Sequence, residues 1–366
     1  MANVLYEESY IQAIADAIRG KTGNTDKMLV SEMADEINGM LETDYGPLLS
    51  RTATSITSNV KEVASCAAYS YDELTELNLP LVETIGSYAF YDCFSLTTLN
   101  IPSVTNIGDY TFYRCNSITT LDLPLLTSMG VNAFEQCIAL TEVYLPSVTS
   151  IGTESFRNCS ALTTLNLPSV TSIGGNAFYN CSSLTALDLP LVETIDEYAF
   201  DNCSNLTTLD LPSVETIGNG AFHSQSGLTV LTTLNLPSVT NIGTANFNSI
   251  TNLTTLCLPL VKSINARCFN SCANLITVDL PSITNIGYDS FKNCDNIEVI
   301  ILRNSDTVCS IGTDVFYTSV SAVNKKYLYV PSTMVDLYKE HYKWPSIVNE
   351  IRAIEDYPDI CGTTTE

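Results

Sequence analysis

The sequence is poor in positive charge and in histidine. It has 16 lysine and arginine residues against 40 aspartate and glutamate residues, and its formal net charge is −24. Such a surface repels phosphate backbones and anionic lipid, so nucleic-acid binding is not expected. The two histidines, His223 and His341, are far apart in the sequence, and no G-x-S-x-G, phosphate-loop, H-E-x-x-H or paired C-x-x-C motif occurs. We therefore expect no enzyme activity, no cofactor and no metal site.

Long apolar runs are absent as well. No stretch approaches the length that crosses a bilayer, so membrane insertion is not expected. The first twenty residues do not show a basic stretch followed by an apolar core and a small-residue cleavage site. Export by the general secretory route is accordingly not expected.

A strict repeat dominates what is present. Proline recurs at intervals of 22 residues, with one interval of 25, and phenylalanine keeps the same rhythm. The prolines are Pro80, Pro102, Pro124, Pro146, Pro168, Pro190, Pro212, Pro237, Pro259 and Pro281. A period in this range predicts a solenoid, in which each coil buries its apolar face only against its neighbours. A repeated sequence also argues against a single catalytic centre, since catalysis needs unique residues at one place.

The first half of one copy predicts a short strand. In L-T-T-L-N-L-P, Leu165 and Leu167 point inward around an outward Asn166, and the proline ends the strand because it has no amide hydrogen to donate. Val170 and Ile173 of the following V-x-x-I-G are also expected in the core.

The second half of the copy predicts a turn. The glycine after Ile173 recurs in most copies, and only aspartate and asparagine replace it, at Asp196 and Asn265. Because these two residues tolerate positive φ best, the position is expected to be left-handed. The following N-A-F-Y-N-C is expected to form one helical turn that carries Phe178 and Cys181 into the core.

The consensus L-P-x-V-x-x-I-G-x-x-A-F-x-x-C-x-x-L resembles the BspA-like class of leucine-rich repeats, over about residues 56–318. The resemblance implies an α/β repeat solenoid with turns of about 22 residues. We predict three parts, which are a small helical module at 1–45, the solenoid at 46–322, and a cap at 323–366. The cap is expected to hold a strand followed by a helix from Ser332, because an open solenoid core must be covered.

Cysteines recur at one position of the repeat, as Cys93, Cys115, Cys137, Cys159, Cys181 and Cys203, and the row resumes at Cys272 and Cys294. Stacked strands lie about 4.8 Å apart, which allows Cα separations that a disulfide can bridge. However, stacked side chains point the same way, and isoleucine replaces the cysteine at position 250. We interpret the row as reduced core thiols, with disulfides or a metal as alternatives.

Two exposed surfaces are candidate binding sites. One is a row of outward strand residues, in which Asp188 and Asp210 are predicted to stack as like charges. Its candidate residues are Tyr144, Asn166, Asp188, Asp210 and Asn235. The other is a tyrosine cluster at Tyr88, Tyr91, Tyr110 and Tyr113, with Tyr69 and Tyr71 before it. The alternatives are an ordinary solvated sheet face and partly buried ridge residues.

The segment before the repeats predicts two short helices. One has an apolar stripe through Ile11, Ile14 and Ile18, and the other carries Met33 and Ile37. Neither helix can bury much alone, so we expect this segment to anchor the protein to a partner, a symmetry mate or the first repeat.

Residues 14–40 resemble a module found near the start of tail-associated structural proteins of phages that infect Gram-positive bacteria, and Tyr329 to Lys339 resembles a segment that often follows BspA-like repeats in such proteins. This resemblance implies a virion-surface protein, made in the host cytoplasm. Its N-terminus would bind other virion proteins, its solenoid would bind a glycan or protein receptor on the host, and it would form a homo-oligomer. The alternatives are an adhesin at the bacterial cell surface, a purely structural virion component and, more distantly, a polysaccharide hydrolase.

Overall fold

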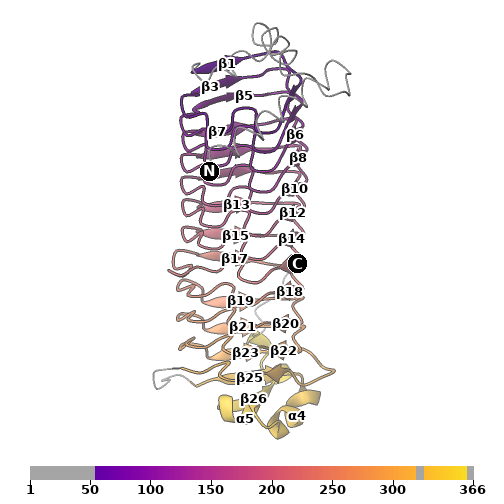
Figure 1. Cartoon of the computed structure of the whole chain (residues 1–366). Coiled ribbons are helices and arrows are strands. Elements are labelled where there is room, and N and C mark those ends of the chain that lie inside the picture. The colour runs from indigo at the N-terminus through magenta and orange to yellow at the C-terminus, as the bar shows by residue number, and fades with distance from the viewer. Residues whose placement is uncertain (1–53, 319–324, 361–366) are drawn as a thin grey trace, which may run out of the picture. The chain divides into compact units, whose positions relative to one another are not determined.

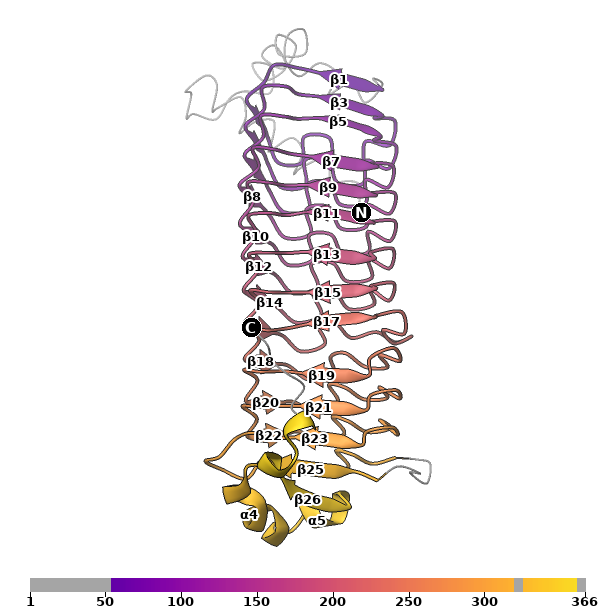
Figure 2. The ribbon, with the colours of Figure 1, turned by 180° about the vertical axis from the view of Figure 1, so that it is seen from behind.

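The computed structural model describes residues 54–318 and 325–360. The chain divides into two compact units, residues 1–170 and 171–366, and each is described by itself. Both units are stacks of short parallel strands in which each coil lies beside the next coil along the chain (Figures 1 and 2). The predicted repeat solenoid is therefore confirmed.

Each coil carries a three-residue strand from the leucine motif and a two-residue strand from the V-x-x-I motif. The three-residue strands of the first unit are β1 (Ser55–Thr57), β3 (Glu76–Asn78), β5 (Thr98–Asn100), β7 (Thr120–Asp122), β9 (Glu142–Tyr144) and β11 (Thr164–Asn166). Those of the second unit are β13 (Ala186–Asp188), β15 (Thr208–Asp210), β17 (Thr233–Asn235), β19 (Thr255–Cys257), β21 (Thr277–Asp279) and β23 (Val299–Ile301). This row of strands holds the candidate strand site.

The two-residue strands form the second row of each stack. In the first unit they are β2 (Glu62–Val63), β4 (Thr84–Ile85), β6 (Asn106–Ile107), β8 (Ser128–Met129) and β10 (Ser150–Ile151). In the second they are β12 (Ser172–Ile173), β14 (Thr194–Ile195), β16 (Thr216–Ile217), β18 (Asn241–Ile242), β20 (Ser263–Ile264), β22 (Asn285–Ile286) and β24 (Ser310–Ile311). Strands β2 to β8 of the first unit and β12 to β24 of the second pair in parallel, and most partners differ by the 22 residues of the repeat, as in Glu62 with Thr84.

The core lies between these rows and the turn. Leu165, Leu167, Val170, Phe178 and Cys181 are buried, as the repeat predicts. The phenylalanine rings stack from coil to coil with centroids 5.2 to 5.6 Å apart in the first unit, and the second unit repeats this ladder. Each ring thus covers the one before it, which is why one coil cannot hide its apolar face alone.

The predicted helical turn is wrong. Residues 174–181 form a series of tight turns in which Asn176 and Asn180 are left-handed, with φ of 54° and 58°. The amides of Asn176, Phe178 and Asn180 donate to carbonyls of the next coil, at 2.8 to 3.0 Å. In a helix those amides would point along the helix axis and could not reach the neighbouring coil. Because every second amide donates to that coil, the segment forms turns and not a helix.

The predicted left-handed glycine is wrong as well. Among the described glycines, only Gly220 and Gly227 have positive φ, and neither occupies the repeat position. Glycine occurs there because the preceding coil runs against it, since a Cβ on Gly218 would lie 2.5 Å from the amide nitrogen of Glu197. Nothing in the structure explains why Asp196 is accepted at the same position.

The stacked cysteines are reduced. All cysteines among the described residues are free, and those of the stacked row are buried. Most of these thiols donate to the carbonyl of the phenylalanine one coil earlier, as in Cys137 to Phe112 at 3.3 Å and Cys159 to Phe134 at 3.3 Å, whereas Cys93 donates to the carbonyl of Ala68. Burial raises the pKa of Cys137 to about 12, so the thiol keeps its proton. The row therefore satisfies buried carbonyls as well as filling volume.

The second unit ends in a strand, short helices and a final strand. The strand is β25 (Tyr327–Val330), and the helices η1 (Ser332–Met334) and α4 (Val335–Glu340) confirm the predicted helix start at Ser332. Two elements that the sequence pattern did not predict follow, α5 (Trp344–Ile347) and β26 (Glu350–Ala353), and β26 pairs with β25. Two further helices follow, η2 (Ile354–Asp356) and η3 (Pro358–Ile360). The boundaries predicted at 45 and 322 stay predictions.

The predicted N-terminal anchor lies outside the described residues. Ile11, Ile14, Ile18, Met33 and Ile37 all belong to that segment.

Candidate binding surfaces

The core positions hold nearly the same residues in every coil, so differences between coils gather on the outside. We use "strand row" for the third residue of each three-residue strand. Because the strands pair in register, these side chains stand one above another on the sheet face.

In the first unit the strand row brings Asp122, Tyr144 and Asn166 together. Tyr144 pairs with Asp122 of β7 on one side and with Asn166 of β11 on the other. All three are exposed, and Tyr144 is 42% accessible as a residue. Asn78 and Asn100 lie in the same row and bond to each other, with Nδ2 of Asn100 donating to Oδ1 of Asn78 at 2.7 Å.

In the second unit the strand row is acidic. Asp188 pairs with Asp210, so the predicted stacking of like charges is confirmed. Asn235 lies on the other side of Asp210 and donates from Nδ2 to Oδ1 at 2.8 Å. An amide donor thus offsets part of the repulsion that two adjacent carboxylates create.

Arg303 joins this row although the sequence analysis did not find it. Its guanidinium binds Asp279 with two nitrogens, at 2.7 and 3.3 Å. The residue comes from a longer connection, since Ile286 pairs with Ile311, 25 residues on. The 25-residue spacing in place of 22 could have indicated an insertion at this point of the repeat, but spacing alone does not predict where the side chain of an inserted residue points.

The tyrosine cluster forms two stacks in the first unit, which we call the tyrosine ridge. Tyr69, Tyr91 and Tyr113 stack with centroids 4.7 and 4.6 Å apart. Tyr88 and Tyr110 form the second stack, at 5.0 Å.

The ridge residues are only partly accessible. Tyr91, Tyr110 and Tyr113 are half-buried, whereas Tyr88 is 37% exposed. Burial raises the pKa of Tyr110 and of Tyr113, so both phenols stay protonated at neutral pH. Tyr71 is buried in the core and is not part of the ridge. The structure thus brings Tyr88, Tyr91, Tyr110 and Tyr113 together, largely as a rigid, self-stacked surface.

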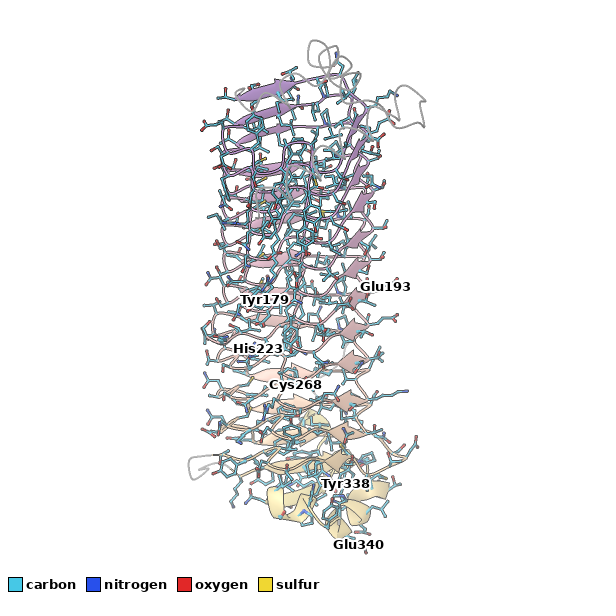
Figure 3. The ribbon with its side chains drawn as sticks, viewed as in Figure 1. Tyr179, Glu193, His223, Cys268, Tyr338 and Glu340 are labelled. Carbon is cyan, nitrogen blue, oxygen red and sulfur yellow. The ribbon has the colours of Figure 1, made fainter. Side chains whose placement is uncertain are left out.

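Ionisable groups on the turn side pair with one another. Oδ1 of Asp201 lies 3.0 Å from Nδ1 of His223. Burial raises the pKa of Asp201, while the hydrogen bond from His223 opposes that rise. Figure 3 labels His223 and Tyr179 on the second unit, together with Glu193, which directly precedes β14.

Within the described residues no three His, Cys, Asp or Glu side chains form a group suited to a metal ion. Stacked tyrosine rings and rows of polar side chains are the features that stand out on the described surface.

These features define a class, the leucine-rich-repeat solenoids. A family model of the BspA type leucine rich repeat region matches residues 48–160, 127–234 and 227–346. The chain therefore belongs to the BspA-type leucine-rich-repeat family. The match covers the described solenoid and the start of its C-terminal end.

The chain is also similar to solved structures of repeat proteins, of which the first below shares its fold. A leucine-rich repeat protein from Bacteroides ovatus is 22% identical, with 83% of this chain and 92% of that chain covered and a TM-score of 0.53. A leucine-rich cell surface protein from Faecalibacterium prausnitzii is 25% identical, with 82% and 79% covered and a TM-score of 0.37. The pneumococcal vaccine antigen PcpA is 18% identical, with 82% and 79% covered and a TM-score of 0.42.

No curated protein matches the chain significantly. In the part of the chain that the structure describes, none of the helices is long and apolar enough to cross a membrane.

Proposed function

We propose that the protein is a bacterial surface protein of the adhesin or host-interaction kind, which binds its ligand through the strand row. One observation carries the proposal. The scaffold repeats almost unchanged, yet its exposed strand row changes from coil to coil and places Tyr144 between Asp122 and Asn166. Surface roles of BspA-like repeats, which the family resemblance implies, agree with this proposal.

Binding accounts for the described surface better than catalysis does. A solenoid offers long, regular flanks and builds its core from repeated residues. His223, one of the two histidines of the chain, is paired with Asp201 through Nδ1 and Oδ1 at 3.0 Å. We infer that the protein acts by contact and has no enzyme activity.

The virion interpretation depends on two segments. Residues 14–40 lie outside the described residues. The segment from Tyr329 to Lys339 covers the end of β25, η1 and most of α4, which follow the last coil of the second unit. The described residues therefore offer no reason to prefer a role in a phage particle, and the comparisons favour the family of bacterial repeat proteins.

Binding of the labelled full-length chain to bacterial and animal cells and to extracellular matrix tests the proposal. We expect saturable binding to at least one of these surfaces, and we expect the double variant Tyr144→Ala/Asn166→Ala to lose it. Tyr88→Asn is the matched control, because it removes an exposed tyrosine of the ridge and asparagine tolerates the φ of 60° at that position. Absence of binding to every surface would contradict the proposal, as would equal losses in both variants.

The place of the protein can be tested separately. Brief protease treatment of intact producing cells should release solenoid peptides if the protein is displayed on the cell surface. Recovery of those peptides only from purified phage particles would instead support the virion role.

A further inference from the structure

We infer that Tyr144, Asp122, Asn166 and Glu142 form a binding subsite for a neutral saccharide. We call these four residues the Tyr144 platform. The inference deepens the proposed function and rests on it, since it names the ligand class and the place on the strand row.

The ring of Tyr144 is free to stack with a ligand. Its neighbours in the row, Asp122 and Asn166, have shorter side chains, so the ring stands above them. Among residues 54–318 and 325–360, no aromatic ring stacks on Tyr144 and no cation covers it. In the tyrosine ridge, by contrast, the rings of Tyr88 and Tyr110 stack on each other with their centroids 5.0 Å apart. The 42% exposure of Tyr144 thus includes ring surface that the fold does not use.

The polar groups of the platform are uncommitted. Within the described part of the chain, the side chains of Asp122, Asn166 and Glu142 make no hydrogen bond or ion pair. Elsewhere in the row such groups are paired, as Asn78 is with Asn100 and Asp279 is with Arg303. Polar side chains that could bond along the row but do not are available to a ligand.

The donor and acceptor pattern selects the ligand. Carboxylates at Asp122 and Glu142 only accept hydrogen bonds, whereas the amide of Asn166 both donates and accepts. A ligand must therefore bring several donors together with an apolar face for the ring. A sugar has both, in its hydroxyl groups and its C–H face.

The negative charge around Tyr144 further restricts the class of ligand. Two carboxylates flank the ring, and the net charge of the whole chain is −24. Sugars that carry carboxylate, sulfate or phosphate would be repelled. A lysine-rich peptide would be attracted, but its binding would depend on salt, whereas hydroxyl contacts to a neutral sugar would not.

Calorimetry on the full-length chain tests the inference. The probes are neutral hexasaccharides of glucose, mannose, galactose and N-acetylglucosamine, with hexalysine as the alternative ligand. We expect at least one hexasaccharide to bind with the same affinity at low and high salt, about 0.05 and 0.5 M. Tyr144→Ala should weaken that binding about tenfold or more, while Tyr144→Phe should stay within about threefold of the original chain.

The controls separate the platform from general effects. Tyr288→Ala removes a tyrosine that is 47% exposed and lies outside the strand row, so it should leave saccharide binding unchanged. Unchanged thermal midpoints would show that each variant is folded.

Three results would overturn the inference. The first is that no saccharide binds at concentrations up to about 10 mM, which corresponds to a binding free energy weaker than about 3 kcal/mol. The second is that Tyr144→Ala binds the saccharide as tightly as the original chain does. The third is that only hexalysine binds, and that its binding depends on salt. If cell binding is seen and no saccharide binds, the inference fails and the proposed function stands. If a saccharide binds at Tyr144 and no cell surface does, the proposed function fails instead.

Discussion

At the scale of single residues, each coil is shaped by the room that its neighbour leaves. Gly218 is needed because a Cβ would meet the backbone at Glu197, and Cys137 fits because its thiol can donate to Phe112. The side chain at such a position must therefore fit both its own coil and the coil beside it. Small substitutions at such positions should therefore lower the free energy of unfolding by more than the conformational preference of the new residue alone would predict.

The glycine position can be tested with a matched pair. Gly218→Ala should lower the free energy of unfolding by about 1–3 kcal/mol, because the added methyl group overlaps the backbone of the preceding coil. Gly175→Ala should be neutral or stabilise by up to about 1 kcal/mol, because its Cβ would lie 3.5 Å from the carbonyl oxygen of Glu197 and φ is not positive. Urea unfolding followed by circular dichroism measures both, and equal stability of the two variants would contradict the steric explanation.

The thiols can be tested by alkylation at pH 8. Cys257 is exposed, so it should react in the folded protein, whereas Cys137 and the other buried thiols of its row should react only after unfolding. The reason is that burial blocks access and raises the pKa of Cys137 to about 12. Peptide mass spectrometry assigns the labels. The unreduced, denatured chain should present 13 thiols, and disulfide-linked peptides from the row would contradict the assignment.

At the scale of elements, the C-terminal end shows how the core is closed. Trp344 of α5 is buried, and its Nε1–H donates to the carbonyl of Cys309 at 2.9 Å. Tyr338 of α4 accepts a bond from the amide of Cys309 at 2.8 Å. Figure 2 shows α4 and α5 beside the last strands of the second unit. The helices therefore supply the partners that a further coil would otherwise have provided.

Removing one of these partners tests the closure. Tyr338→Phe should cost about 1–3 kcal/mol, because it leaves the buried amide of Cys309 without an acceptor. Tyr342→Phe, at a side chain that is 79% exposed, should leave stability unchanged. Thermal unfolding compares the two variants, and equal melting temperatures would show that water or another group satisfies the amide.

At the scale of the whole molecule, the repeat makes the protein modular. Each coil is held by its own core and by the coils next to it, so stability is close to a sum of coil and interface contributions. The formal net charge of −24 disfavours anionic partners.

Deleting one complete coil tests this modularity. Removal of residues 186–207, which are 22 residues of the second unit, joins Thr185 to Thr208 and restores the L-T-T-L-D motif. We expect a folded protein with the same type of circular dichroism spectrum and a lower free energy of unfolding. Removal of residues 186–196 alone should prevent folding of the coils on either side, because it places core residues opposite surface residues. Equal behaviour of the two deletions would contradict an additive stack.

Much of the fold follows from the sequence alone. The 22-residue spacing determines the coil, and the positions of Leu165, Phe178 and Cys181 within it predict the core, because ten near-copies average out the ambiguity of any single copy. The same spacing places Asp188 opposite Asp210 and Tyr144 beside Asn166. The binding roles of these residues stay predictions.

Tertiary structure decided the rest. The left-handed residues Asn176 and Asn180 follow from hydrogen bonds to the next coil, and no pattern within one copy contains that constraint. The same holds for Arg303 on Asp279 and for β26 beside β25, since each depends on residues that leave the repeat. The pattern of buried residues is a local property, and the sequence repeats it in every coil. The direction of a backbone amide or of an inserted side chain depends instead on which neighbouring group in the folded structure can form a hydrogen bond or ion pair with it.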